Sequence, residues 1–277
     1  MKIFDSKVRP RTDQLLQAWT AMQKPGFAEY NEYINIYKMK SRLTPMPMQE
    51  LIDFAAQSGV EKMLICGNDP EDNDHILDLA KKHDSLAPVC SVSVEQGIRY
   101  ALREVERCCD LGATAIYMAP YKIKRDVNDH QLYPVYGYCE LIQKPLILHG
   151  AIHYWYGSYM WHGQPRFVDE VAVDFPELKL IISQGGNGFG SEMIAVAQRH
   201  RNVYLEFSAL SPGSMPPEFL YAANTYLRSK CTFGTDYPKL EFDGAIDKWK
   251  KVLREEVWED FFCNNIIRAL YEEPIRF

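Results

Sequence analysis

The sequence predicts a (β/α)8 barrel, a TIM barrel of the α/β class, that forms a single domain over residues 1–277. Three observations lead to this fold. Eight short runs are almost continuously apolar, as expected of parallel strands covered on both faces. Segments with helical spacing of apolar residues lie between these runs. No Pro-, Gly- or Ser-rich linker or charge block marks a domain boundary. Strands that alternate with helices favour a closed barrel, and an open doubly wound sheet is the alternative.

The expected strands are spread along the whole chain. In order, they are KIFDS at 2–6, KMLICG at 62–67, LAPVCSVS at 86–93, TAIYMA at 114–119, PLILHG at 145–150, LKLIISQ at 178–184, VYLEFS at 203–208 and CTFGTD at 231–236. The connection between the first two, residues 10–61, is long, and its early part, AWTAMQKPGFAEYNEYINIYK, is rich in tyrosine. We expect this connection to cover the mouth of the barrel.

The segments between the runs carry helix signals at their ends. PMQELIDFAAQSG at 47–59 and QGIRYALREVERCCDLG at 96–112 both end on a glycine, which suits a helix carboxyl terminus. EDNDHILDLAKKH at 71–83 begins with acidic residues and ends with basic ones, in agreement with the helix dipole. The segments 191–200 and 244–256 follow the same pattern, so each predicts a helix.

Charge and composition exclude several classes of function. The net charge is -6, from 31 basic and 37 acidic residues, which argues against a nucleic-acid or anionic-membrane partner. No apolar run approaches the roughly 20 residues of a membrane span, and the amino terminus lacks the apolar segment of a secretory signal. The seven cysteines include no Cys-x-x-Cys pair and are interpreted as reduced, buried thiols. We therefore expect a cytoplasmic protein.

Polar side chains lie at or just beyond the carboxyl ends of the predicted strands, the edge of such a barrel where chemistry takes place. In chain order they are Asp5, Lys7, Arg9, Tyr117, Tyr121, His149, Gln184, Glu206, Ser208 and Asp236. Each alone also has a structural interpretation, because a histidine after an apolar run is often a core residue and an aspartate in GTDYP often caps a turn. Together, at the ends of several strands, they favour a functional site.

Several segments also resemble a known family. PLILHGA is similar to the family's strand-five histidine segment, FVDEVAVDFPELKLIISQGGNG to its helix and strand six, RNVYLEFSA to strand seven, CTFGTDYP to strand eight and NNIIRAL to its closing helix. In this order they resemble the amidohydrolase superfamily, in the amidohydrolase-related branch of aminocarboxymuconate-semialdehyde decarboxylase, resorcylate decarboxylases and pyrone-dicarboxylate lactonases. The resemblance covers most of the chain and implies a barrel enzyme.

The chain departs from that family at the metal-binding positions. The family opens with Asp-x-His-x-His, whereas residues 5–9 read DSKVR, and Gln184 replaces the histidine that ends strand six. By this resemblance, only His149 and Asp236 remain of the metal set. We expect no metal, and the alternative is a divalent ion such as zinc held by His149 and Asp236.

Lys7 and Arg9 raise a question of their own. Alternation along a strand places residues i and i+2 on one face, so these two cations should project together. Like charges repel unless an anion lies between them, and protonated lysine and arginine have no lone pair for a metal. Their geometry suits a carboxylate or a phosphate. We therefore expect a small anionic substrate, and the alternative is a pair of salt bridges in an inactive site.

Two loops carry further signals. GGNGFGSE at 185–192 is similar to a dinucleotide fingerprint but has the spacing G-x-G-x-G, so it predicts a tight strand-to-helix turn. GAIHYWYGSYMWHGQPR at 150–166 is crowded with aromatic residues, among them Tyr154 and Trp155. It predicts an aromatic lid over a flat or cyclic substrate, and the alternative is a contact between copies in a homo-oligomer.

The function expected from the sequence is metal-independent hydrolysis of a lactone, ester or amide of a small carboxylic acid. Some members of the resembled family work without a metal. The expected catalytic residues are Asp236 as general base, His149 and Gln184. The expected substrate-binding residues are Lys7, Arg9, Tyr117, Tyr154, Trp155 and Glu206. Decarboxylation, hydration or isomerisation, and non-catalytic binding of an anionic metabolite, are the alternatives.

Overall fold

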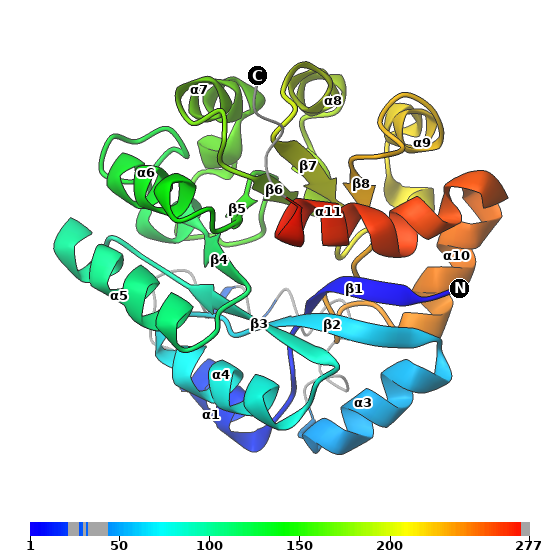
Figure 1. The fold of residues 1–277 in the computed structure, drawn as a ribbon, viewed down its shortest axis with the longest axis horizontal. Coiled ribbons are helices and arrows are strands. Elements are labelled where there is room, and N and C mark those ends of the chain that lie inside the picture. Colours follow the sequence, from blue (N-terminus) through cyan, green and yellow to red (C-terminus); the bar gives the residue numbers. More distant parts are fainter. Residues whose placement is uncertain (22–27, 30–31, 33–43, 273–277) are drawn as a thin grey trace.

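Eight parallel strands form the centre of the structure, a computed structural model that describes residues 1–21, 28–29, 32 and 44–272 (Figure 1). They are β1 (Ile3–Val8), β2 (Val60–Cys66), β3 (Leu86–Ser91), β4 (Ala115–Met118), β5 (Leu146–His149), β6 (Leu180–Ser183), β7 (Val203–Glu206) and β8 (Cys231–Thr232). Each strand pairs with the next. The segment after β8 returns to β1, where Ser6 N donates to Phe233 O at 3.0 Å and Asp236 N donates to Lys7 O at 2.8 Å. The sheet therefore closes into the predicted barrel, and the open-sheet alternative is wrong.

Helices surround the barrel on its outside (Figure 1). They are α1 (Asp13–Thr20), α3 (Met48–Gln57), α4 (Asn73–Lys82), α5 (Ile98–Asp110), α6 (Tyr133–Leu141), α7 (Pro165–Asp174), α8 (Ser191–Arg199), α9 (Pro217–Asn224) and α10 (Phe242–Val252), whereas α11 (Asn265–Tyr271) lies across one end of the barrel. Local signals fix several ends. Thr12 caps α1 by accepting from Leu15 N, and Pro165 begins α7 with its fixed φ. Gly112, with φ +100°, follows α5 as predicted.

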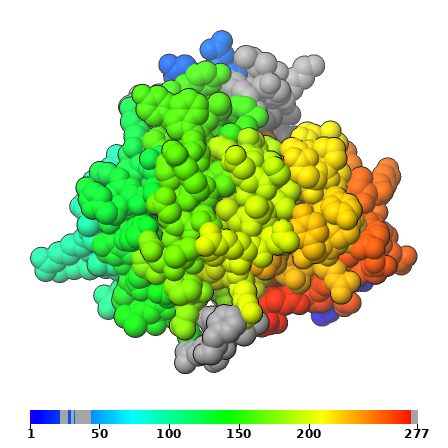
Figure 2. Space-filling view, turned by 90° about the horizontal axis from the view of Figure 1, so that it is seen from above, coloured from blue at the N-terminus to red at the C-terminus, as the bar shows by residue number. Residues whose placement is uncertain are grey.

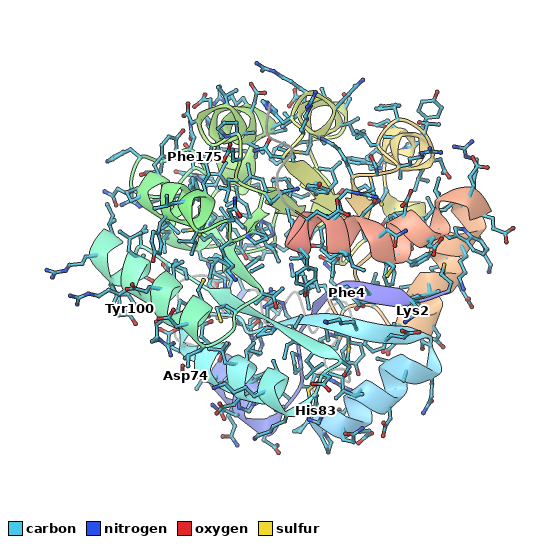
Figure 3. All side chains as sticks on the ribbon, viewed as in Figure 1. Lys2, Phe4, Asp74, His83, Tyr100 and Phe175 are labelled. Carbon is cyan, nitrogen blue, oxygen red and sulfur yellow. The ribbon has the colours of Figure 1, made fainter. Side chains whose placement is uncertain are left out.

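Two apolar layers hold the barrel together. The outer layer lies between the strands and the helices, and the inner layer fills the barrel itself. The inner layer includes Phe4, which Figure 3 shows near the barrel centre, whereas Asp74 and Tyr100 lie on the outer ring. Ile266 and Leu270 of α11 join the inner layer and cover its amino-terminal end. The opposite end, at the carboxyl ends of the strands, is left for the site.

The strands from β2 to β8 end before their predicted carboxyl ends, whereas β1 extends beyond its predicted end to Val8. β8 ends at Thr232, although 231–236 is apolar enough to suggest a longer strand. Asp236 has φ +50°, which no extended strand allows. The predicted turn at 185–192 is present, and a Cβ on Gly186, at φ +74°, would lie 2.2 Å from Met193. These departures turn the chain into the loops that carry the site.

The long first connection is only partly described. Its tyrosine-rich part falls largely on 22–27, 30–31 and 33–43, so the predicted cover over the mouth lies outside the described residues. Helix α1, from the same connection, supplies Leu15, Leu16 and Trp19 to the wall of the central cavity.

The outer face that Figure 2 shows is formed by the helices from α6, in green, to α9, in yellow. Within the residues that the structure describes, no helix combines the length and apolar character needed to cross a membrane.

Candidate active site

A cavity of about 170 Å³ opens at the carboxyl ends of the strands. Its lining combines charged and aromatic side chains from segments that are far apart in the sequence. They are Lys7, Arg9, Pro10, Arg11, Leu15, Leu16, Trp19, Asn68, Tyr117, Tyr121, Lys122, His149, His153, Tyr154, Trp155, Gln184, Asp236, Pro238 and Lys239. Five of these side chains are cationic and one is a carboxylate, so the cavity is strongly electropositive.

Lys7 lies at the base of this cavity and is only 4% exposed. Its Nζ donates to Ser183 Oγ at 2.8 Å and lies 3.7 Å from Asp236 Oδ1. Burial alone would lower the pKa of Lys7, but the negative charges of Asp236, Tyr117 and Glu206 together outweigh burial and raise the pKa. Lys7 is therefore an ammonium ion at neutral pH.

Arg9 joins Lys7 on the same carboxylate. Its Nε donates to Asp236 Oδ1 at 3.1 Å, and its Nη1 donates to Gly67 O and to Asn68 Oδ1. Among the described residues, Nη2 has no hydrogen-bond acceptor. The guanidinium is thus fixed on one side by the loop after β2 and keeps donors for a ligand.

Asp236 is held between the two cations. Burial would raise its pKa, but Lys7, Arg9 and Lys239 together outweigh burial and lower the pKa to about 2. Its backbone lies in the left-handed region, as does that of Gln184 at φ +59°. Non-glycine residues adopt this conformation at an energetic cost and are concentrated at functional sites.

His149 ends β5 and faces the same cavity. Burial, followed by the positive charge of Lys7, lowers its pKa well below the ordinary value. Its Nδ1 is buried and has no hydrogen-bond partner among the described residues. The imidazole is therefore neutral at pH 7 and offers one N–H donor.

Two carboxyl groups lie beneath Lys7, inside the barrel. Glu206 accepts from Ser6 Oγ at 3.3 Å and from Ser208 Oγ at 2.8 Å. Asp5 accepts from Lys7 N and Thr235 N, both at 3.0 Å, and from Thr235 Oγ1 at 2.6 Å. Burial raises the pKa of Asp5 to about 7, although these three hydrogen bonds each lower it. Burial also raises the pKa of Glu206, although the charge of Lys7 opposes it.

The walls of the cavity are aromatic. The ring centroid of Tyr117 lies 5.4 Å from Lys7 Nζ and 6.0 Å from Arg9 Cζ. Tyr121 stacks on His153 at 4.0 Å and lies 4.7 Å from the ring of His149. These contacts align three rings along one side of the space above the cations.

The comparisons with known proteins identify the family of this chain. A family model described as Amidohydrolase matches residues 25–271, which is most of the chain. The chain belongs to the amidohydrolase family. Among proteins with curated functional descriptions, none matches this chain significantly.

Solved structures show the same fold. An uncharacterized TIM-barrel protein from Bordetella bronchiseptica is 22% identical, with a TM-score of 0.79 over 98% of this chain and 99% of that chain. A 5-carboxyvanillate decarboxylase from Novosphingobium aromaticivorans, complexed with manganese and 4-hydroxy-3-methoxy-5-nitrobenzoic acid, is 13% identical, with a TM-score of 0.74 over 97% and 96% of the two chains. A probable 2-pyrone-4,6-dicarboxylic acid hydrolase from Acinetobacter baumannii, with citric acid bound, is 11% identical, with a TM-score of 0.68 over 98% and 99%.

The side chains at the base of this cavity do not fit a divalent metal. Asp236 already faces two cations, and an ammonium ion occupies the space beside it. His149 is the remaining neutral nitrogen donor of the expected set. Among the described residues, no group of three or more His, Cys, Asp and Glu side chains is arranged to hold a metal ion. We therefore derive no chemical step through a metal.

The structure brings most of the predicted site residues to this one cavity. The residues in its lining are Lys7, Arg9, Tyr117, His149, Tyr154, Trp155, Gln184 and Asp236. Glu206, expected to contact substrate, lies outside this lining. It is fully buried beneath Lys7 because it points into the barrel from β7.

Sequence analysis missed several residues of the site. Lys122 and Lys239 add positive charge to the cavity, and Ser183 holds the ammonium of Lys7. Lys239 follows Asp236 by three residues, and Ser183 directly precedes Gln184. Proximity to these predicted residues was the available signal, but lysine and serine are ordinary residues of exposed loops, so their types alone did not mark them.

Proposed function

We propose that this amidohydrolase hydrolyses a lactone, ester or amide of a small carboxylic acid without a metal ion. The supporting observation is the arrangement of Lys7 and Arg9 around Asp236 at the base of an electropositive cavity. Two fixed cations attract a carboxylate, and the aromatic walls suit a flat or cyclic body. Family membership supports an enzyme, and the choice of hydrolysis is part of the proposal.

Substrate binding follows from the donors that remain on the two cations. The Nη2 of Arg9 and the ammonium of Lys7 hold the substrate carboxylate, and the ring of Tyr117 covers both. Tyr154 and Trp155, at the mouth, pack against the body of the substrate. This binding fixes the scissile carbonyl near Asp236 and His149, and such positioning lowers the barrier to attack by water.

The chemical step is a proton transfer coupled to the addition of water. Asp236 takes a proton from water as its oxygen bonds to the carbonyl carbon. The neutral imidazole of His149 and the amide of Gln184 donate to the oxyanion that forms. The bond to the leaving oxygen or nitrogen then breaks, and Asp236 returns the proton to the leaving group. The products are an acid and an alcohol or amine, joined in one molecule if the substrate is cyclic.

The basicity of Asp236 depends on the substrate itself. A carboxylate with a pKa of about 2 is a weak general base while both cations face it. A bound substrate carboxylate shares those cations and adds a second negative charge, and both effects raise the pKa of Asp236. Esters without a carboxylate should therefore react slowly even when they fit the cavity.

A panel of substrates tests the proposal. Lactones that carry a carboxylate should open, and the same lactones as methyl esters at that carboxylate should react at least about a hundredfold more slowly, given the loss of a charge-assisted contact. Product analysis should include unsaturated carboxylic acids. Release of CO2 from these acids, with no lactone opened, would contradict hydrolysis and favour decarboxylation.

A further inference from the structure

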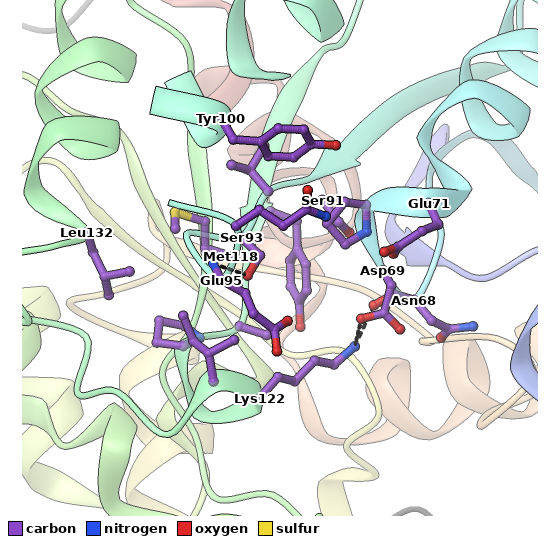
Figure 4. A pocket seen from close by; sticks show the side chains of 17 residues that line it. Asn68, Asp69, Glu71, Ser91, Ser93, Glu95, Tyr100, Met118, Lys122 and Leu132 are labelled. Carbon is purple, nitrogen blue, oxygen red and sulfur yellow. Dashed lines mark hydrogen bonds and ion pairs between the residues drawn. The ribbon is translucent and has the colours of Figure 1, made fainter. Parts of the chain in front are cut away.

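A second cavity lies next to the first at the carboxyl ends of β2, β3 and β4 (Figure 4). Its volume is about 50 Å³, enough for a small group but too little for a whole substrate. Asn68, Tyr117 and Lys122 line both cavities, so the two spaces share one wall. A molecule held by Lys7 and Arg9 is therefore adjacent to this second space.

The charge of the second cavity is opposite to that of the first. Asp69, Glu71 and Glu95 surround it, and Lys122 is the one cation in its lining (Figure 4). Lys122 donates to Asn68 O and lies 3.3 Å from Asp69 Oδ1. The remaining negative charge attracts a positively charged group, while the neighbouring cavity attracts a negative one.

Ser91 supplies an independent indication of a ligand. The residue is 5% exposed, and its Oγ is buried with no hydrogen-bond partner among the described residues. Its backbone is fixed, because Ser91 N donates to Asn73 Oδ1 at 2.8 Å and Asn73 Nδ2 donates to Ser91 O at 2.9 Å. An unpaired buried hydroxyl destabilises the fold, so a rigidly held one that lines a cavity is suited to a ligand.

The ligand group that fits is an organic cation. The described acids do not gather three ligating side chains for a metal ion. An ammonium group carries three donors, which match carboxylates and a hydroxyl spread around a small space. Met118, Ile123 and Leu132 add apolar lining for the carbon atoms that carry it.

We propose that the second cavity binds the ammonium group of a zwitterionic substrate whose carboxylate lies on Lys7 and Arg9. This inference rests on the proposed function for the position of the carboxylate. It narrows the substrate class to derivatives of amino acids, such as cyclic amides or esters that retain a free amino group.

The test is calorimetric titration with ω-amino acids and with the unsubstituted acids of the same length. The pairs are β-alanine with propionate, 4-aminobutyrate with butyrate, 5-aminopentanoate with pentanoate and 6-aminohexanoate with hexanoate. At least one amino acid should bind about tenfold more tightly than its partner, as expected for one charge-assisted hydrogen bond. Glu95→Gln and Ser91→Ala should reduce that ratio, and Glu106→Gln, an exposed acid of α5 that lines neither cavity, should not.

Two results would overturn the inference. Equal or weaker binding of every amino acid relative to its partner contradicts the ammonium site and leaves the carboxylate site intact. Failure of all the acids to bind contradicts the proposed carboxylate site, and the inference with it. Without ligand, the Ser91→Ala variant should melt at the same temperature as the wild type or at a higher one, since it removes an unpaired hydroxyl. A clearly lower melting temperature would assign the hydroxyl a structural role and would also contradict the inference.

Discussion

Lys7 decides what kind of chemistry the site can support. Replacement by methionine keeps most of the side-chain volume and removes the charge beside Asp236 and above Glu206. Binding of a carboxylate ligand should weaken by roughly 2–5 kcal/mol, the range for breaking a buried charge pair. The pKa of Asp236 should rise at the same time, because one of the three cations that lower it, Lys7, Arg9 and Lys239, is lost.

Titration calorimetry and carboxyl NMR measure these two effects, and Lys2→Met is the matched control. Lys2 precedes β1, and its side chain is 76% exposed beside Glu61. Unchanged ligand affinity in Lys7→Met would contradict the assignment of Lys7 to the anion site.

Asp236→Asn separates binding from turnover. The amide retains an oxygen for Arg9 but cannot accept a proton from water, so turnover should fall at least about a hundredfold while carboxylate ligands still bind. For the wild-type enzyme, the low pKa of Asp236 and the neutral state of His149 predict no loss of kcat/KM as the pH falls from 8 to about 5. A steady decline over that range, or a fully active Asn variant, would exclude Asp236 as the base.

The titration of Asp5, a buried acid, should make the stability of the fold depend on pH. Its pKa is about 7 in the folded state, against 3.8 as the ordinary value, so the folded state holds the proton more tightly. Its contribution to stability is therefore complete below pH 3.8 and is lost as the pH rises through about 7. Asp5→Asn should remove this decline, which amounts to roughly 1.4 kcal/mol per unit of pKa difference. Denaturant unfolding at pH 5 and pH 8 measures it, and the same decline in both proteins would contradict this assignment.

Single residues were predictable where their type was unusual for their position. Lys7 and Arg9 stand out because cations rarely end a buried strand, and His149 and Asp236 stand at strand ends where barrels carry chemistry. Ser183 and Glu206 lie inside the barrel, and their contact with Lys7 depends on the register of β1 with strands far away in the sequence. Residue types alone do not contain that register.

At the level of elements, the hydrophobic pattern predicted the order of strands and helices well. Apolar runs mark the strands because both their faces are covered, and Gly112 marks a helix end because its φ is positive. Pattern reasoning extended β8 to residue 236, since Phe233 is as apolar as a strand residue. The carbonyl of Phe233 accepts a hydrogen bond from Ser6 N of β1, but the chain then turns and brings Asp236 into the site.

The loop 150–166 divides into an inner and an outer part. His153 is 7% exposed, and its Nε2 pairs with Tyr159 O at 2.9 Å while Trp155 N donates to its Nδ1 at 3.1 Å. Trp155 thereby lines the cavity, whereas Tyr159 and Trp161 stack on each other and are exposed. His153 thus positions the aromatic residues that we expect to cover a substrate.

His153→Phe should loosen this loop. The phenyl ring keeps the stacking surface for Tyr121 but removes both hydrogen bonds, so amide exchange across 153–160 should accelerate and KM should rise about tenfold with a smaller change in kcat. His130→Phe is the control, because the His130 side chain is 87% exposed. Exchange that is the same in His153→Phe and in the wild type would show that these bonds do not hold the loop.

At the scale of the molecule, the barrel brings the two ends of the chain to one site. Arg9 and Asp236 are 227 residues apart in sequence and share a hydrogen bond, because the segment after β8 closes against β1. α11 covers the opposite end of the barrel, so the site has a single open face among the described elements. This closure brings the cations at the end of β1, Lys7 and Arg9, against the carboxylate of Asp236.

We propose that Lys7 and Arg9 fill the place that a metal ion would take in this site, and the metal content of the enzyme tests this proposal. The enzyme should be purified without chelator, incubated with zinc and manganese, freed of unbound metal and measured by elemental analysis alongside its hydrolytic rate. We predict well below one metal ion per chain and a rate that chelators do not change, because Lys7 and Arg9 offer no lone pair and repel a cation. One zinc or manganese ion per chain, with activity lost on chelation and restored by the metal, would contradict the account.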